Sequence, residues 1–209
     1  MKNMQLLSEH LRPKEFADLI QPLGIIRRFE AMVARGEPRN LLFYGEPGLG
    51  KTSAARLLLT KLGDNFFEIN GSLRTGIEDI RDIEVAANSL GLGDGPRMCF
   101  IDEAEYLSRN AQAGLRGLIE RSHCRFILTA NDISKFHPAL KSRCMPVCFD
   151  TRSGEAAAII TRLVPRYMHA LTTEDIMIRE ERLKELMAIY FPDLRGLANR
   201  IEFEAIDCD

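Results

Sequence analysis

A glycine-rich segment, YGEPGLGKTS at residues 44 to 53, has the composition of a phosphate-binding loop. The pattern G-x-x-x-x-G-K-[ST] is filled by Gly45, Gly50, Lys51 and Thr52. Glycines let backbone N–H groups converge on an anion, a following helix adds the positive end of its dipole, and the lysine reaches the outer phosphates. The pattern predicts a nucleotide site with Thr52 as a ligand of Mg²⁺. The residues expected around the phosphates are Gly45, Glu46, Pro47, Gly48, Leu49, Gly50, Lys51, Thr52 and Ser53.

Two adjacent acids end an apolar run in RMCFIDEAEYLS, residues 97 to 108. Nucleotide hydrolysis needs one carboxylate for the metal and another for the attacking water. Asp102 suits the first role and Glu103 the second. Such an ending is by itself often a solvated strand edge, but its place after a phosphate loop favours the catalytic interpretation.

Asn131 closes the next apolar run, RFILTAN, and its amide would lie beside the end of the Asp102 strand. In that place the amide would be free to hold the attacking water. Taken by itself, however, an asparagine in this setting is better explained as a turn former.

These side chains need a scaffold that brings strand ends together. Short apolar runs recur at residues 41–44, 66–69, 98–101, 126–128 and 147–149. Segments with apolar residues three and four apart, residues 52–62, 77–90 and 111–120, separate several of them. This alternation predicts an α/β fold with a five-stranded parallel sheet flanked by helices.

The pattern changes after Asp150. Residues 154–171, 181–191 and 194–206 have helical periodicity, and Pro192 with Asp193 marks a break between the last two. We therefore predict two domains, a nucleotide-binding α/β domain at residues 1–150 and a small all-helical domain at residues 151–209.

The composition is that of an ordinary globular chain, with 45% hydrophobic and 28% charged residues among 209 and a net charge of −2. No apolar run is long enough to cross a membrane and the N-terminus lacks a secretory signal, so we expect a cytoplasmic protein. The spacing of Cys144 and Cys148, without a second Cys or His pair, is weak evidence for zinc. Buried free thiols are expected for the five cysteines, which are Cys99, Cys124, Cys144, Cys148 and Cys208.

The stretches NLLFYGEPGLGKTSAARLL, CFIDEAEYLSRNAQAGLRGLIE and RFILTANDISKFHPALKSRC resemble AAA+ P-loop ATPases, and in particular clamp-loader subunits of the replication factor C small-subunit and T-even phage type. The resemblance extends from SEHLRPKEFADLI to FPDLRGLANRIE, nearly the whole chain. It implies an ATPase that uses ATP and Mg²⁺, with the helical domain acting as a lid.

The resemblance also assigns roles by position. The motif Glu-x-x-Arg-Pro places Arg12, Pro13 and Ile20 in the adenine pocket, Asn131 corresponds to sensor 1, and Arg195 to sensor 2 on the lid. Arg143, in Ser-Arg-Cys, resembles the arginine finger that completes a neighbouring subunit's site. The missing leading tryptophan and the His10-Leu11 pair depart from the family pattern.

The family threads primed DNA through a spiral of subunits, so the implied contacts to the DNA backbone are Arg74, Arg81, Arg109 and Arg116. Gly117 stands where the family often has another arginine. The implied partners are other clamp-loader subunits or further copies of this chain, a sliding clamp and primed DNA. Clamp-loader subunits usually continue into a helical collar, so the end at Asp209 indicates either a truncated form or a compact relative.

Three functions remain open from the sequence. The first is ATP-driven loading of a sliding clamp in DNA replication. The second is an AAA+ remodeller or helicase loader that acts on a protein partner. The third is a nucleotide-dependent switch with little turnover, against which Glu103 argues because a switch needs no acid to activate water.

Overall fold

The computed structural model describes residues 7–73, 76–89, 93, 95–150 and 155–206. Up to the last strand its elements are α1 (Leu7–His10), η1 (Phe16–Asp18), α2 (Leu23–Arg35), β1 (Leu41–Tyr44), α3 (Lys51–Leu62), β2 (Phe66–Asn70), α4 (Ile77–Asn88), β3 (Met98–Asp102), η2 (Ala104–Tyr106), α5 (Arg109–Arg121), β4 (Arg125–Ala130), η3 (Ile133–Lys135), α6 (Pro138–Lys141) and β5 (Met145–Cys148). Three helices follow, α7 (Ala156–Thr173), α8 (Glu180–Tyr190) and α9 (Leu194–Ile206).

The five strands form one parallel sheet in the order β2-β3-β4-β1-β5. The central strand β1 is paired on both sides, with Leu41 opposite Ile127 of β4 and Met145 of β5. This confirms the predicted α/β fold and its five-stranded sheet. The strand ends differ by a few residues from the expected ones, and β4 in particular is longer at both ends.

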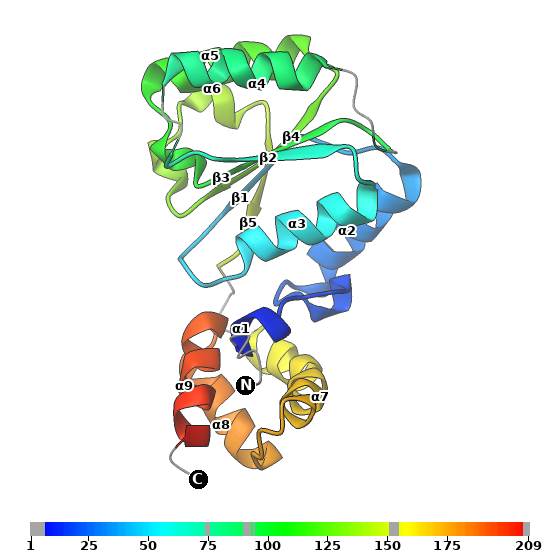
Figure 1. Cartoon of the computed structure of the whole chain (residues 1–209), viewed down its shortest axis with the longest axis vertical. Coiled ribbons are helices and arrows are strands. Elements are labelled where there is room, and N and C mark those ends of the chain that lie inside the picture. The colour runs from blue at the N-terminus through cyan, green and yellow to red at the C-terminus, as the bar shows by residue number, and fades with distance from the viewer. Residues whose placement is uncertain (1–6, 74–75, 90–92, 94, 151–154, 207–209) are drawn as a thin grey trace, which may run out of the picture.

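Helices cover both faces of the sheet, as Figure 1 shows, with α4, α5 and α6 on one face and α2 and α3 on the other. Successive side chains of a strand point to opposite faces. Leu41 and Phe43 therefore belong to the apolar core under α2 and α3, whereas Leu42 between them joins the core under α4 and α5. A strand buried on both faces must be apolar throughout, which explains the uninterrupted run in β1.

The C-terminal helices α7, α8 and α9 pack on one another at the end of the molecule opposite α4 and α5 (Figure 1). Helix α1, from the N-terminal segment, packs against α9. Leu7 of α1 and Leu197 of α9 share one continuous apolar core with Phe29 of α2. The all-helical C-terminal unit is thus present, and the boundary at residues 150 and 151 stays a prediction.

Three of the described cysteines are buried, and burial raises their thiol pKa values, to about 12 for Cys124 and Cys144 and well above the usual range for Cys99. The prediction of a buried thiol is wrong for Cys148, which is exposed. It lies on β5, an edge strand of the sheet, where one side chain face is open to solvent. Cys208 lies outside the described residues.

None of the helices in the described part of the chain has the length and apolarity that crossing a bilayer requires.

Candidate functional site

The loop between β1 and α3 has the backbone of a phosphate cradle. Gly45, Gly48 and Gly50 all have positive φ angles, of 141°, 83° and 75°, which side chains on L-residues rarely allow. A Cβ at Gly45 would lie 2.7 Å from Oδ1 of Asp150, so the position is closed to other residues by space as well as by conformation. Helix α3 begins at Lys51, directly after the loop, and its first N–H groups face the same space.

Lys51 is buried, at 8% exposure, and fills the curl of this loop. Its Nζ donates to the carbonyl oxygens of Gly45 and Glu46, both at 2.7 Å, and to Oδ1 of Asn131 at 2.9 Å. Burial lowers the pKa of Lys51, and the nearby carboxylates, Glu105 first among them, oppose that shift. Lys51 and Asn131, both predicted from the sequence, therefore lie together, beyond the ends of the neighbouring strands β1 and β4.

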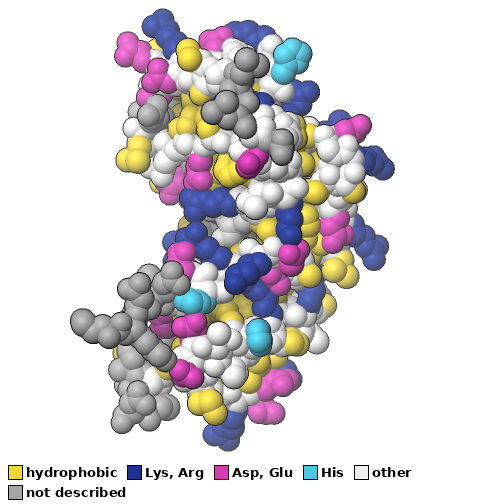
Figure 2. All heavy atoms as spheres, turned by 45° about the vertical axis from the view of Figure 1, so that its right-hand side comes forward, with side chains coloured by type: hydrophobic (Ala, Val, Ile, Leu, Met, Phe, Trp, Pro, Cys, Tyr) yellow, Lys and Arg dark blue, Asp and Glu magenta, His cyan; other side chains and the backbone are white. Residues whose placement is uncertain are grey.

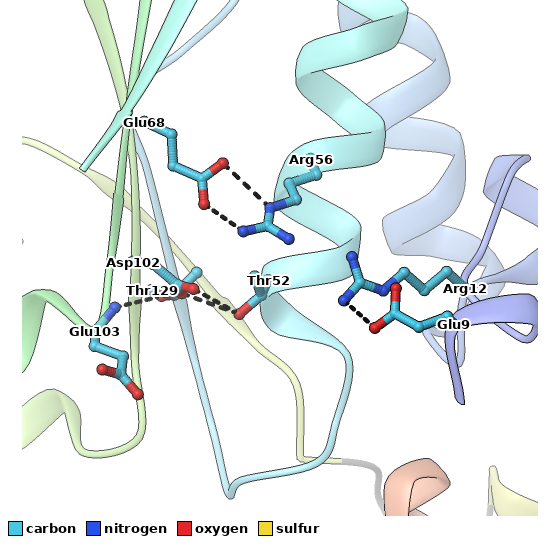
Figure 3. Close-up of polar contacts among 8 residues, drawn as sticks. All are labelled: Glu9, Arg12, Thr52, Arg56, Glu68, Asp102, Glu103 and Thr129. Carbon is cyan, nitrogen blue, oxygen red and sulfur yellow. Dashed lines mark hydrogen bonds and ion pairs between the residues drawn. The ribbon is translucent and has the colours of Figure 1, made fainter. Parts of the chain in front are cut away.

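A second group of polar contacts joins the start of α3 to the ends of β3 and β4. Oγ1 of Thr52 donates to Asp102, at 3.0 Å from Oδ1 and 3.1 Å from Oδ2 (Figure 3). Asp102 also accepts a hydrogen bond from the hydroxyl of Thr129. A hydroxyl and a carboxylate at this spacing are the oxygen donors that Mg²⁺ prefers, so Thr52 and Asp102 fit the predicted metal ligands.

Glu103 has φ 55° and ψ 39°, a left-handed backbone that is uncommon outside glycine and that often marks a functional position. Its N–H donates to Oγ1 of Thr129 at 3.0 Å, which fixes the turn at the end of β3. Figure 3 shows its carboxylate turned away from the contact between Thr52 and Asp102. The side chain lines the same cavity as that pair.

Glu105 and Thr129 are two residues of the site that the sequence did not reveal. The turn η2 carries Glu105 inward, where it is 6% exposed and its Oε1 accepts from the N–H of Asn131 at 2.9 Å. Its other oxygen is buried without a hydrogen-bond partner. Thr129 is a buried hydroxyl among the apolar residues that follow Arg125 in β4, and this polar interruption is the signal that pointed to it.

These groups line a cleft of about 350 Å³ between the loop, the N-terminal segment and the C-terminal helices. The residues predicted for the adenine pocket, Arg12, Pro13 and Ile20, line it, and so does Arg195 at the start of α9. Figure 2 shows Lys and Arg side chains gathered where the α/β part meets the C-terminal helices, at an indentation of the molecule. Residues from four distant parts of the sequence thus meet at one site.

The C-terminal helices reach the loop through Asp193. Its Oδ1 caps α9 by accepting from the N–H groups of Arg195 at 3.1 Å and Gly196 at 3.0 Å. A Cβ at Gly48 would collide with the same carboxylate. The start of α9, and Arg195 with it, is therefore in contact with the loop.

The chain also matches proteins of a known family. Residues 41–150 match the family model described as ATPase family associated with various cellular activities (AAA). The chain is 32% identical to the replication factor C small subunit of Archaeoglobus fulgidus, over 100% of this chain and 68% of the relative. The chain belongs to the AAA ATPase family. A second small subunit, from Methanococcus maripaludis, is 37% identical to this AAA ATPase over 96% of the chain and 65% of the relative.

Among solved structures, the RuvB Holliday junction branch migration motor of Thermotoga maritima superposes on this AAA ATPase with a TM-score of 0.63. The alignment covers 92% of this chain and 72% of RuvB at 20% identity, which supports the fold alone.

Arg143 lies away from the cleft of this AAA ATPase. It lies just before β5, and the N–H of the first β5 residue donates to the carbonyl of Asn40, just before β1. Arg143 is therefore at the edge of the sheet where the parallel strands begin. Lys51 is at the opposite edge, where the strands end. Its guanidinium donates to the Glu120 carboxylate and to the carbonyl of Ala139. The cleft and Arg143 are thus on opposite edges of the sheet.

The predicted DNA contacts lie on two neighbouring helices. Arg81 on α4 and Arg109 and Arg116 on α5 are exposed, and the two helices pack together on one face of the sheet. No ion pair holds any of these three arginines within the described part of the chain. Arg74 lies outside the described residues.

Proposed function

We propose that this AAA ATPase hydrolyses ATP as one subunit of a clamp loader in DNA replication. The observation that carries the proposal is the 32% identity to the Archaeoglobus fulgidus replication factor C small subunit along the entire chain. The chain spans 68% and 65% of the two relatives described above, so their whole activity is an inference for this chain. The arrangement of the cleft supports the chemistry, step by step.

Lys51 binds the outer phosphates of ATP in this proposal. Its Nζ donates two hydrogen bonds to loop carbonyls and one to Asn131, and phosphate oxygens take over the acceptor positions that Glu46 O and Asn131 Oδ1 now hold. Release from Lys51 frees the Asn131 amide for the attacking water. Arg12, Pro13 and Ile20 enclose the adenine base at the other end of the cleft.

Thr52 and Asp102 would hold a magnesium ion, because their oxygens already face each other within 3.1 Å. A bound magnesium ion supplies positive charge that offsets the charge developing on the transferred phosphoryl group. The hydroxyl of Thr129 donates to Asp102 and accepts from the N–H of Glu103. One buried side chain thus holds both acids in position.

Glu103 takes the proton of the attacking water, and Asn131 orients that water. Arg195 contacts the terminal phosphate from the lid. Because Asp193 caps α9 and touches Gly48 of the loop, a change at the phosphates is passed directly to the C-terminal helices. Hydrolysis would in this way alter the position of the lid.

Arg143 acts in trans, on the nucleotide of a neighbouring subunit. Its place at the amino edge of the sheet removes it from its own cleft, and its exposed partner Glu120 holds the guanidinium ready at the surface. Arginine fingers supplied by a neighbour contribute roughly 10³ to 10⁵ in rate. The neighbours are other clamp-loader subunits or copies of this chain, and the assembly binds a sliding clamp. Arg81, Arg109 and Arg116 contact the backbone of primed DNA.

The proposal is tested by the rate of ATP hydrolysis per chain, measured over a range of protein concentrations with and without primed DNA and a sliding clamp. We expect the rate per chain to rise with concentration and to increase further when clamp and primed DNA are both present. Arg143→Ala should abolish the concentration dependence, whereas Arg35→Ala, an exposed arginine on α2, should leave it unchanged.

Other results would favour another function. Stimulation by a helicase or another protein partner, with no response to clamp and primed DNA, would identify a remodeller or helicase loader. Tight ATP binding with negligible turnover in every combination would identify a nucleotide-dependent switch. Equal turnover at all concentrations would contradict the trans role of Arg143.

A further inference from the structure

Arg162 on helix α7 contacts the main chain of the segment between α1 and α2. Its Nη2 donates to the carbonyl of Leu19 at 2.5 Å and to that of Gln21 at 2.9 Å. Among the described residues no acid forms an ion pair with Arg162, its Nε is buried without a partner, and burial lowers its pKa. Partial burial of a guanidinium without a carboxylate has a desolvation cost, so its contacts to the two carbonyls need an explanation.

Arg166, one turn further along α7, makes the same kind of contact at the other end of the segment. Its Nη2 donates to the carbonyl of Leu11 at 2.8 Å and to that of Arg12 at 2.6 Å. Its Nε lies 3.2 Å from Oδ1 of Asp18. No backbone N–H in the described part of the chain donates to any of the four carbonyls that the two arginines bind. Helix α7 therefore supplies the hydrogen bonds that regular secondary structure would otherwise provide.

The segment held in this way is one wall of the nucleotide cleft. Residues 11–13 and 18–21 line the cleft, whereas Arg162 does not. The turn η1 is the only regular element that the structure shows between α1 and α2, so helix or strand hydrogen bonds do not fix the shape of the wall. Figure 1 shows the segment between α7 on one side and α2 and α3 on the other.

The wall is also attached to the α/β part of the molecule. Nζ of Lys61 on α3 donates to both carboxylate oxygens of Glu15, each at 2.8 Å. The ring of Phe16 packs against that of Phe29 on α2, with 6.2 Å between the centroids. Helix α3 begins at Lys51 in the phosphate loop. The wall thus joins the helix that follows the phosphate loop to the first of the C-terminal helices.

We propose that Arg162 and Arg166 are positioning residues, which hold the wall of the cleft in its binding conformation from α7. A wall that is ordered before binding costs less to occupy than one that the ligand must order. Because the same contacts join the wall to α7, occupation of the cleft and the placement of α7 favour each other. The inference rests on the proposed binding of ATP in this cleft.

Arg162→Met is the sharper of the two possible variants, because Arg162 does not line the cleft and cannot contact a ligand there. Titration calorimetry with ATP and with tripolyphosphate, which has three phosphates and no base, separates an effect on the wall from an effect on the phosphate loop. Arg162→Met should weaken ATP binding roughly 10-fold and leave tripolyphosphate binding unchanged. Arg166→Met should weaken ATP binding in the same direction.

Arg182→Met is the matched control. Arg182 is another arginine of the C-terminal helices, but it donates to the carboxylates of Glu204 and Glu185 and does not line the cleft. Loss of these contacts affects only the stability of those helices, so the affinity for ATP should stay at the wild-type value.

Steady-state kinetics of the assembled ATPase give a second readout. Arg162→Met should raise KM for ATP roughly 10-fold and keep kcat within about twofold of the wild-type value, because the groups around the phosphates are unchanged. A general loss of structure would not separate the two constants in this way.

Unchanged affinity for ATP in Arg162→Met would overturn the proposal for the two arginines alone. An equal loss of affinity for ATP and tripolyphosphate, or a fall in kcat with unchanged KM, would overturn it as well, because the damage then reaches the phosphate loop. A wild-type chain that binds neither ligand would overturn the proposed function, and the positioning role of the arginines with it.

Discussion

Replacing Glu105 by leucine tests whether this buried acid positions Asn131. The variant removes the carboxylate that accepts from the Asn131 N–H at 2.9 Å, a charged hydrogen bond whose net contribution is about 1.5 to 3 kcal/mol. Removing the unpaired second oxygen of Glu105 offsets part of that loss. We expect a net destabilisation of about 2 kcal/mol, which corresponds to a fall in Tm of roughly 4 to 8 °C for a chain of this size.

The effect on catalysis should be larger than the effect on ATP binding. A misplacement of about 1 Å in a catalytic group costs roughly 10²-fold in rate, so Glu105→Leu should lower kcat by about 10- to 100-fold with little change in KM for ATP. Glu105→Gln keeps an oxygen that accepts from Asn131 and should restore most of kcat. Steady-state ATPase kinetics and thermal unfolding of both variants measure the two effects.

Glu30→Leu, on the exposed side of α2, is the matched control for Glu105→Leu and should change neither quantity. If Glu105→Leu lowers Tm while kcat stays at the wild-type value, the link from Glu105 to Asn131 does not exist. The same conclusion follows if Glu105→Gln is as slow as Glu105→Leu.

Three further predictions concern other parts of the site and surface. Because burial lowers the pKa of Lys51, this side chain should lose its charge at a lower pH than an ordinary lysine does. ATP affinity, measured by calorimetry, should therefore fall as the pH rises. The fall should be steeper than in Lys51→Arg, whose guanidinium stays charged. With Cys208 replaced by serine, Ellman's reagent at pH 8 should modify the exposed Cys148 quickly. It should modify Cys144 slowly, because that thiol is buried and its pKa is about 12. Equal rates for the two cysteines would contradict the burial of Cys144. Arg109→Glu with Arg116→Glu should weaken binding of the assembled subunits to primed DNA and flatten its salt dependence, which fluorescence anisotropy would detect.

Much of the fold followed from local patterns in the sequence. The run at residues 41–44 is apolar because β1 is paired on both sides and covered on both faces, and such strands are the easiest to recognise. The strand β5 was harder, because as an edge strand it needs apolar residues on one face only. For that reason Cys148 was wrongly expected to be buried.

The candidate site was predictable where its residues share a motif, as Lys51 and Thr52 do. Glu105 was missed because its role depends on the turn η2, which directs it inward, whereas the sequence showed only a third acid after Asp102 and Glu103.

Contacts between distant parts of the chain were beyond the reach of local patterns. The Glu120 carboxylate that holds Arg143 is 23 residues away in the sequence, and the contact arises because the end of α5 meets the segment before β5. Asp193 and Gly48 meet in the same way, through packing of the C-terminal helices on the loop.

The most direct test of the central claim, that each subunit completes its neighbour's site, is to mix Lys51→Ala with Arg143→Ala. Each variant alone should be almost inactive, because one lacks the lysine that we propose binds phosphate and the other the arginine that we propose acts in trans. In an equal mixture that assembles head to tail, about a quarter of the sites combine an intact Lys51 with a neighbour's intact Arg143, so about a quarter of wild-type ATPase activity should return. A mixture no more active than the average of the two variants would contradict the claim.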